Sequence, residues 1–131
     1  MIGVDTNVLI RVFIDDDPDQ TTAARQLVAG AAPGGLLISI IVLVEFVWTL
    51  RAIFKVDKTD LANALDGILT RTAFVVEDRP DVEAALQRYK SAKIDISDVL
   101  IAARNRRLGA LRTVSFDRGA IRNALFEPLT P

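Results

Sequence analysis

The chain has 131 residues, half of them apolar and a quarter charged, with a formal net charge of −1. This length and composition are typical of one globular domain, and the net charge does not indicate a strongly basic nucleic-acid binder. The sequence has no cysteine and no histidine, which excludes disulfides, thiolate or histidine metal sites, and Ser-His-Asp catalysis. A metal site would need oxygen ligands, which favour hard ions such as Mg²⁺ or Mn²⁺.

The first half of the chain predicts strands that alternate with helices. Residues 2–5 ("IGVD") and 36–39 ("LLIS") read as short buried strands. A brief helix is expected over 7–13, and a second begins at Pro18, capped by Asp17 and ended by "PGG" at 33–35. A third helix is expected over 40–54, apolar on nearly all sides, and an amphipathic fourth over 58–71, with its apolar side chains at helical spacing (Leu61, Ala64, Leu65, Ile68, Leu69).

The second half continues the same alternation. Residues 73–76 ("AFVV") predict a strand, and Pro80 opens a helix that runs to about residue 92. A helix over 95–109 is closed by Gly109. A strand over 111–115, a loop with a short helix, and a last short strand within "LFEPL" complete the chain. Apolar strands that alternate with helices predict one α/β domain over residues 1–131, with a parallel sheet covered on both faces.

No membrane segment or secretory signal is expected. The most apolar stretch, residues 36–50, contains Glu45 and is shorter than the ~20 residues of a membrane span. The opening "MIGVDTNVLIR" lacks a basic n-region and has an early acid. We therefore expect a cytoplasmic protein.

Two acids of the first half stand at unusual places. Asp5 ends the first strand, where ligands gather in open parallel sheets. It could instead cap the following helix, although Thr6 is also a competent cap. Glu45 is the one charged residue in the apolar stretch, where a carboxylate is costly unless it faces water, a cation or a hydrogen-bond donor. A salt bridge to a nearby arginine is the alternative.

Three acids of the second half occupy similar positions. Asp95 and Asp98 are three residues apart at a helix start, so one can cap the helix and the other can lie in its first turn. Asp117 follows the strand over 111–115 in "SFDRG", where a turn aspartate is common. Strand ends of a parallel sheet converge, so Asp5, Glu45, Asp98 and Asp117 are expected to cluster. A divalent cation would compensate their charges, and carboxylates suit Mg²⁺.

Further charged runs have simpler interpretations. The acids at 15–17 ("DDD") are expected to be a solvated loop and a helix cap. Arg104, Arg106 and Arg107 lie near a helix C-terminus, where positive charge is favourable. Arg104 and Arg107 are the candidates for contacts to RNA phosphates.

These residues resemble the four acidic motifs of PIN domains. The matching segments are "MIGVDTNVLIR", "VLVEFVWTLR", "DISDVLIAARNRRLGA" and "TVSFDRGA", and their flanking residues look most like VapC-type toxins of prokaryotic toxin–antitoxin pairs. The resemblance spans almost the whole chain. It implies a three-layer α/β/α fold with a parallel sheet of about five strands, and a Mg²⁺- or Mn²⁺-dependent ribonuclease.

The resemblance also implies roles for residues of this chain. The family's four acids correspond to Asp5, Glu45, Asp98 and Asp117. Thr6 and Asn7 match the polar residues that follow the first acid, and Asp95 matches an additional acid of many relatives. One departure is Gly119, because many relatives have a further acid near that place.

The expected reaction is hydrolysis of an RNA phosphodiester by metal-activated water. Asp5 and Asp98 would be the main ligands, with Glu45 and Asp117 completing the site around one ion or two. An aspartyl phosphatase fits poorly, because Asn7 stands where its second aspartate would be. The sequence is also compatible with a non-toxic RNA-processing PIN nuclease and with an inactive metal-binding interaction module.

The resemblance further implies a cognate antitoxin, whose arginine or lysine could reach Asp5, Glu45 or Asp98. Several apolar residues exceed what one small core obviously needs, so we also expect a homodimer. The alternative is that all of them lie in the monomer core. These residues are Leu9, Val12, Phe13, Trp48, Ile53 and Phe54.

Overall fold

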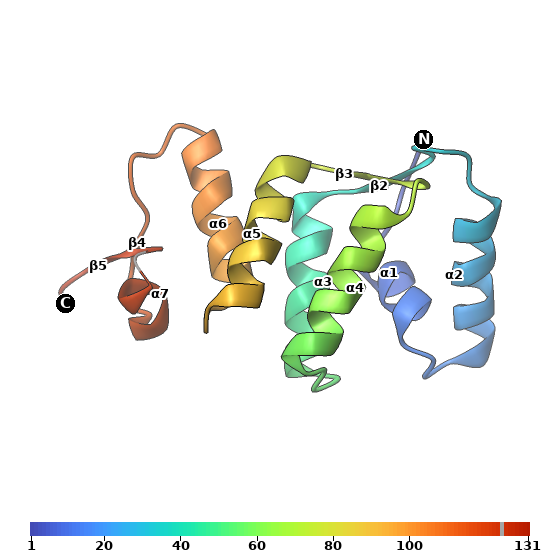
Figure 1. Cartoon of the computed structure of the whole chain (residues 1–131), viewed down its shortest axis with the longest axis horizontal. Coiled ribbons are helices and arrows are strands. Elements are labelled where there is room, and N and C mark those ends of the chain that lie inside the picture. The colour runs from blue at the N-terminus through green and yellow to red at the C-terminus, as the bar shows by residue number, and fades with distance from the viewer. Residues whose placement is uncertain (124) are drawn as a thin grey trace. The chain divides into compact units, whose positions relative to one another are not determined.

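The computed structural model describes residues 1–123 and 125–131, and within them the chain divides into two compact units, Met1–Arg79 and Pro80–Pro131. Figure 1 shows the helices and strands of each unit in chain order. In the first unit they are β1 (Ile2–Gly3), α1 (Thr6–Phe13), α2 (Pro18–Gly30), β2 (Leu36–Ile38), α3 (Ile40–Ala52), α4 (Lys58–Thr70) and β3 (Phe74–Val76). In the second unit they are α5 (Arg79–Ser91, which begins at the boundary), α6 (Ile96–Arg107), β4 (Val114–Ser115), α7 (Arg118–Arg122) and β5 (Glu127–Pro128).

A parallel three-stranded sheet organises the first unit. Its order is β1-β2-β3, with Leu36 of β2 opposite both Ile2 and Phe74. Parallel neighbours need crossover connections, and α1 with α2, then α3 with α4, supply them. All three strands therefore end at the same edge of the sheet, and the segments that follow begin there.

The core of the first unit lies between this sheet and its helices. Leu36 and Ile38 of β2 are almost fully buried, as is Phe46 of α3. Burial of one such side chain contributes about 1.5–3 kcal/mol. The apolar face of α4 is buried as its periodicity predicted (Leu61, Ala64, Leu65, Ile68, Leu69). Helix α3 has apolar side chains all round, and its outer face leaves Ile41 and Trp48 exposed.

Helices α5, α6 and α7 of the second unit each have buried side chains. Helix α5 buries Val82, Leu86 and Tyr89, and α6 buries Ile96 and Leu100. Strands β4 and β5 form a parallel pair of two residues each. Helix α6 ends two residues before Gly109, whose φ of 98° is readily adopted by glycine, as the predicted closure required.

The structure confirms the predicted class and corrects the predicted sheet. The chain is α/β, its strands pair in parallel, and each predicted helix is present within a few residues of its expected bounds. The five expected strands fall into sheets of three and two among the described residues, so the largest sheet is smaller than the five strands expected. Strands β1, β4 and β5 have two residues each, and such short strands form few ladder hydrogen bonds.

The apolar residues expected to exceed the core differ in their burial. Leu9 and Val12 of α1 are buried, so the expectation of an available surface is wrong for them. Phe13 and Phe54 are half-buried, whereas Trp48 and Ile53 are exposed. Among the described residues, no helix is both long and apolar enough to cross a membrane.

Candidate active site

Asp5 lies at the edge where β1 ends and α1 begins. Its backbone is extended (φ −78°, ψ 157°) at the N-cap position of α1, yet its side chain makes no capping hydrogen bond. The carboxylate is exposed at the positive end of the helix, where negative charge is favourable. Capping by the side chain therefore does not explain an acid at this position.

Glu45 is held beside the start of α1 by Thr6. The Thr6 hydroxyl is buried and donates to Oε1 of Glu45 at 2.9 Å. A buried hydroxyl needs a partner, and Glu45 supplies it across 39 residues of sequence. Glu45 itself is exposed, and among the described residues it forms no ion pair with an arginine, so the salt-bridge alternative is not realised. The contact brings the second predicted acid next to the residue that follows the first.

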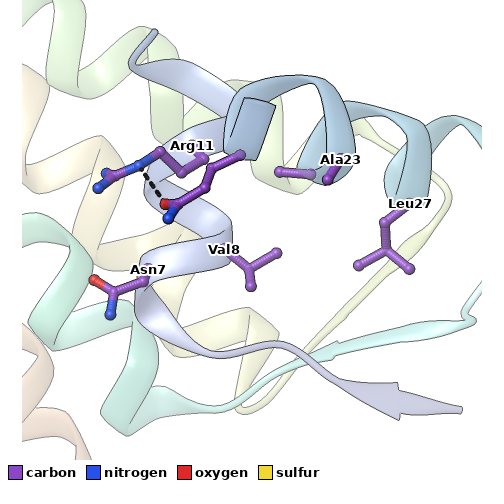
Figure 2. A pocket seen from close by; sticks show the side chains of 7 residues that line it. Asn7, Val8, Arg11, Ala23 and Leu27 are labelled. Carbon is purple, nitrogen blue, oxygen red and sulfur yellow. Dashed lines mark hydrogen bonds between the residues drawn. The ribbon is translucent and has the colours of Figure 1, made fainter. Parts of the chain in front are cut away.

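Asn7 faces a different part of the first unit. It lines a hollow of about 280 Å³ on α1 and α2 together with Val8, Arg11, Gln20, Ala23, Ala24 and Leu27. Figure 2 shows Asn7 and Val8 on α1 and Ala23 and Leu27 on α2. The lining contains no acid. None of the predicted acidic residues therefore lines this hollow.

Asp95 and Asp98 take the two predicted roles at the start of α6, one as the cap and the other in the first turn. The Asp95 side chain accepts from the backbone N–H of Ser97 at 2.9 Å and so caps the helix. Asp98 lies in the first turn, where the helix dipole favours an acid. Both side chains are half-buried.

Asp117 caps the short helix α7. Its Oδ1 accepts from the N–H of Ala120 at 3.0 Å, and its own N–H donates to Oγ of Ser115 at 2.9 Å. A Cβ at position 119 would lie 3.3 Å from that Oδ1, which is a tight contact. Gly119 therefore leaves room for the capping carboxylate, which gives a local reason for the departure from the acidic pattern of relatives.

The candidate donors suit a hard divalent cation in their chemistry. All are carboxylate oxygens, since the chain has neither histidine nor cysteine. Asp5 and Glu45 belong to the first unit, and Asp95, Asp98 and Asp117 to the second. Over residues 1–123 and 125–131, no three acidic side chains gather closely enough to hold a metal ion. The structure thus brings Glu45 to the start of α1. That Asp5, Asp98 and Asp117 bind one metal site together with Glu45 stays a prediction.

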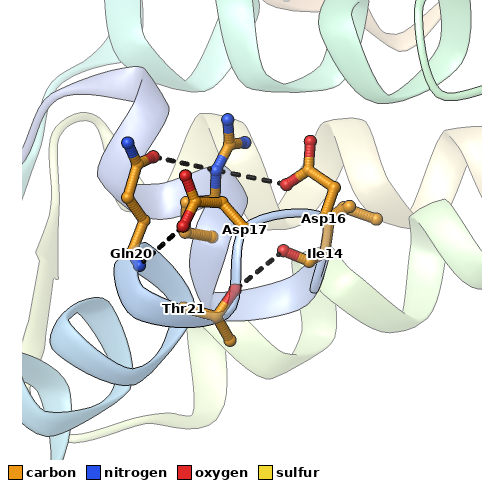
Figure 3. A network of polar contacts seen from close by, with 6 residues as sticks. Ile14, Asp16, Asp17, Gln20 and Thr21 are labelled. Atoms are coloured by element: carbon orange, nitrogen blue, oxygen red, sulfur yellow. Dashed lines mark hydrogen bonds and ion pairs between the residues drawn. The ribbon is translucent and has the colours of Figure 1, made fainter.

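The acids of the α1–α2 loop have the structural roles expected of them. Asp17 accepts from the N–H of Gln20 at 3.1 Å and caps α2. Asp16 pairs with Nε of Arg11 at 3.2 Å. Figure 3 shows this network together with the hydrogen bond from Thr21 to the carbonyl of Ile14. Two of the three loop acids are therefore occupied by local contacts.

The basic end of α6 includes an ion pair that sequence reasoning missed. Nε of Arg107 donates to Oδ2 of Asp81 on α5 at 2.8 Å. This hydrogen bond, with the charges of Arg107 and Arg106, lowers the pKa of Asp81 below its usual value. Arg104 is half-buried and Arg106 is exposed. No local pattern links residues 81 and 107, because the contact depends on the packing of α5 against α6.

Glu77 was also missed, although a signal was available. It directly follows β3, as Asp5 follows closely on β1. Its Oε1 accepts from the N–H of Ile40 at 2.8 Å, so it occupies the N-terminus of α3 together with Ser39. An acid directly after a buried strand could have marked Glu77. Its observed contact is a helix cap contributed from a distant part of the chain.

Comparison with known proteins agrees with the motif pattern. A family model described as PIN domain matches residues 2–124. A relative named VapC ribonuclease from Aquifex aeolicus (strain VF5) is 25% identical over 117 residues, which cover 88% of this chain and 86% of the relative. The match includes residues of both units and all four predicted acids. The chain belongs to the PIN domain family.

Proposed function

We propose that this chain is a metal-dependent endoribonuclease that acts as the toxin of a type II toxin–antitoxin pair. The observation that carries the proposal is the start of α1, where the Asp5 carboxylate makes no capping hydrogen bond and Thr6, the next residue, binds Glu45. Membership of the PIN family and the likeness to a VapC ribonuclease support the reaction class. The substrate class is RNA.

Each acid has a distinct part in the proposed reaction. Asp5 and Asp98 would hold a Mg²⁺ or Mn²⁺ ion, and Glu45 and Asp117 would complete its surroundings. A bound ion of this kind lowers the pKa of a water and stabilises charge on phosphoryl oxygens. Glu45 accepts the Thr6 hydrogen through Oε1, which leaves Oε2 to orient the attacking water.

The accessory residues act through these acids. Thr6 is a positioning residue because its hydroxyl contacts Glu45 and it is itself buried. Asp95 positions Asp98 by capping the helix that carries it. Asn7 has an exposed side chain next to Thr6 and could contact RNA or a partner.

Partners follow from the proposed toxicity. A cognate antitoxin would restrain the nuclease in the cytoplasm, where RNA is available. An antitoxin arginine or lysine near Asp5, Glu45 or Asp98 would match the negative charge there. Homodimerisation is the second expected contact. It is supported by Trp48 and Ile53, which are 52% and 61% exposed on and just after α3.

Metal-dependent cleavage is the test of the enzyme. Purified protein and defined single-stranded RNAs should give cleavage with Mg²⁺ or Mn²⁺ and none in excess EDTA. Asp5→Asn and Asp98→Asn keep the side-chain shape and remove ligand charge, so each should lower kcat by at least about a hundredfold with the fold retained. The measurements are gel-resolved cleavage and circular dichroism.

Asp15→Asn is the matched control. It removes the same charge from an exposed aspartate of the α1–α2 loop, away from the predicted acidic site, so it should cleave at the wild-type rate. Cleavage that persists in EDTA would contradict the metal-dependent reaction. Wild-type rates for both Asp5→Asn and Asp98→Asn would contradict the assignment of the acids.

A further inference from the structure

Positive charge is concentrated in the second unit. Residues 80–131 contain nine lysines and arginines against six acids, a net charge of +3, whereas residues 1–79 contain seven against eleven, a net charge of −4. The overall charge of −1 conceals this asymmetry. Because polyanions are attracted by local charge, the second unit is the better place to bind an RNA backbone.

A hollow of about 240 Å³ lies at the C-terminal end of α6, lined by Asp81, Ala103, Arg106 and Arg107. We call it the α6 hollow. Ala103 stands three and four residues before the two arginines, so all three lie on neighbouring positions of the helix surface. The small side chain of Ala103 leaves space beside the two long ones.

The two arginines of the α6 hollow differ in their contacts. Arg107 is oriented by Asp81, whose carboxylate accepts from its Nε at 2.8 Å. Arg106 is exposed and, over the described part of the chain, forms no hydrogen bond or ion pair through its side chain. Asp81 offsets one of the two positive charges, so the lining keeps a net charge of +1. One oriented and one uncommitted guanidinium are suited to a phosphate group.

We propose that the α6 hollow binds a backbone phosphate of the RNA substrate, with Arg106 as the direct contact and Asp81 as the residue that positions Arg107. The identification of the anion as RNA rests on the proposed function. RNA is the favoured anion because α6 carries both Asp98, a predicted metal ligand, and Arg106. Asp98 and Arg106 are eight residues apart in α6, or about 12 Å along its axis. This exceeds the ~3.4 Å rise of one nucleotide in a stacked strand, so the bound phosphate lies more than one nucleotide from the scissile bond.

The test measures RNA binding without cleavage. Wild-type protein and Arg106→Gln are titrated in EDTA against a labelled single-stranded RNA about eight nucleotides long, with fluorescence anisotropy followed from low to moderate salt. Arg106→Gln should bind roughly fivefold more weakly at low salt, and the slope of log K against log salt should fall by about 0.7, the value for one lost phosphate contact on a single strand.

Arg112→Gln is the matched control. Arg112 belongs to the same unit and carries the same charge, but it is paired with Glu127 at 3.2 Å and does not line the hollow. Its salt slope should stay within error of the wild type. An Arg106→Gln slope equal to the wild-type slope would overturn the proposal and leave Arg106 as a charge that offsets the negative end of α6.

Two further measurements separate this proposal from the proposed function. A dinucleotide is too short to reach the α6 hollow from Asp98, so the defect of Arg106→Gln should disappear with it. If wild-type protein binds RNA through Arg106 but cleaves none with Mg²⁺ or Mn²⁺, the proposed function fails and the binding site stands. If wild-type protein cleaves RNA while Arg106→Gln binds it normally but loses affinity for an acidic peptide, the hollow serves a protein partner and the RNA proposal fails.

Discussion

At the residue scale, Thr6 connects two acids that are distant in sequence. Its buried hydroxyl donates to Glu45, and its backbone directly follows Asp5. Thr6→Val keeps the shape and removes the donor, so Glu45 would lose its orientation while the core stays filled. We expect kcat to fall about tenfold and Mg²⁺ affinity to weaken by a similar factor, as is typical when a residue that orients a ligand is removed.

The measurements for this variant are steady-state cleavage and calorimetric Mg²⁺ titration. Thr6→Ser restores the hydroxyl and should recover most of both losses. If Thr6→Val binds Mg²⁺ and cleaves RNA like the wild type, Thr6 has only a packing role.

At the element scale, Asp81 and Arg107 connect α5 to α6. The pKa of Asp81 is lowered by its hydrogen bond with Arg107, so its folded-state pKa lies below the unfolded value of about 3.8. The pair therefore stabilises the fold above that pH, and the stabilisation is lost as pH falls through the lower, folded-state value. Asp81→Asn should lower the free energy of unfolding at pH 7 by up to about 1 kcal/mol, because the pair is partly exposed.

Urea unfolding at several pH values tests this prediction. The difference between wild type and Asp81→Asn should shrink as the pH falls below about 3.8, where the carboxyl of the unfolded state takes up a proton, and should vanish once the folded-state carboxyl is protonated at lower pH. Glu127→Gln breaks the more exposed pair with Arg112 and should change stability by only a few tenths of a kcal/mol. A difference for Asp81→Asn that does not depend on pH would exclude the ion pair as its cause.

At the scale of the whole molecule, the family match includes residues of both units. The two units carry net charges of opposite sign. If the chain is a toxin, expression in bacteria without an antitoxin should arrest growth. Asp5→Asn should remove the arrest, and Asp15→Asn should keep it, because that aspartate lies in the solvated loop. Growth curves at matched soluble expression provide the measurement.

Coexpression with the cognate antitoxin should restore growth. Harmless wild-type protein that still cleaves RNA in vitro would point instead to an RNA-processing nuclease without toxicity. Harmless protein without cleavage would favour an interaction module.

The sequence by itself determined the features that depend on neighbouring residues. Asp17 caps its helix as predicted, and of the predicted pair Asp95 and Asp98 it is Asp95 that caps, because a capping bond joins residues two or three apart. The apolar spacing of α4 identified its buried face for the same reason. The α/β class followed from the alternation of such segments, and the four acidic motifs identified the family.

Tertiary structure alone decided the contacts between distant segments. Asp5 and Asp117 both stood at helix starts in the sequence, yet Asp117 caps its helix and Asp5 does not. Thr6 and Glu45 are 39 residues apart, Ile40 and Glu77 are 37 apart, and Arg107 and Asp81 are 26 apart. Each hydrogen bond requires two elements to pack in one register, and packing depends on the shapes of many buried side chains at once. Local patterns therefore placed the candidate acids on their elements, and packing selected their partners.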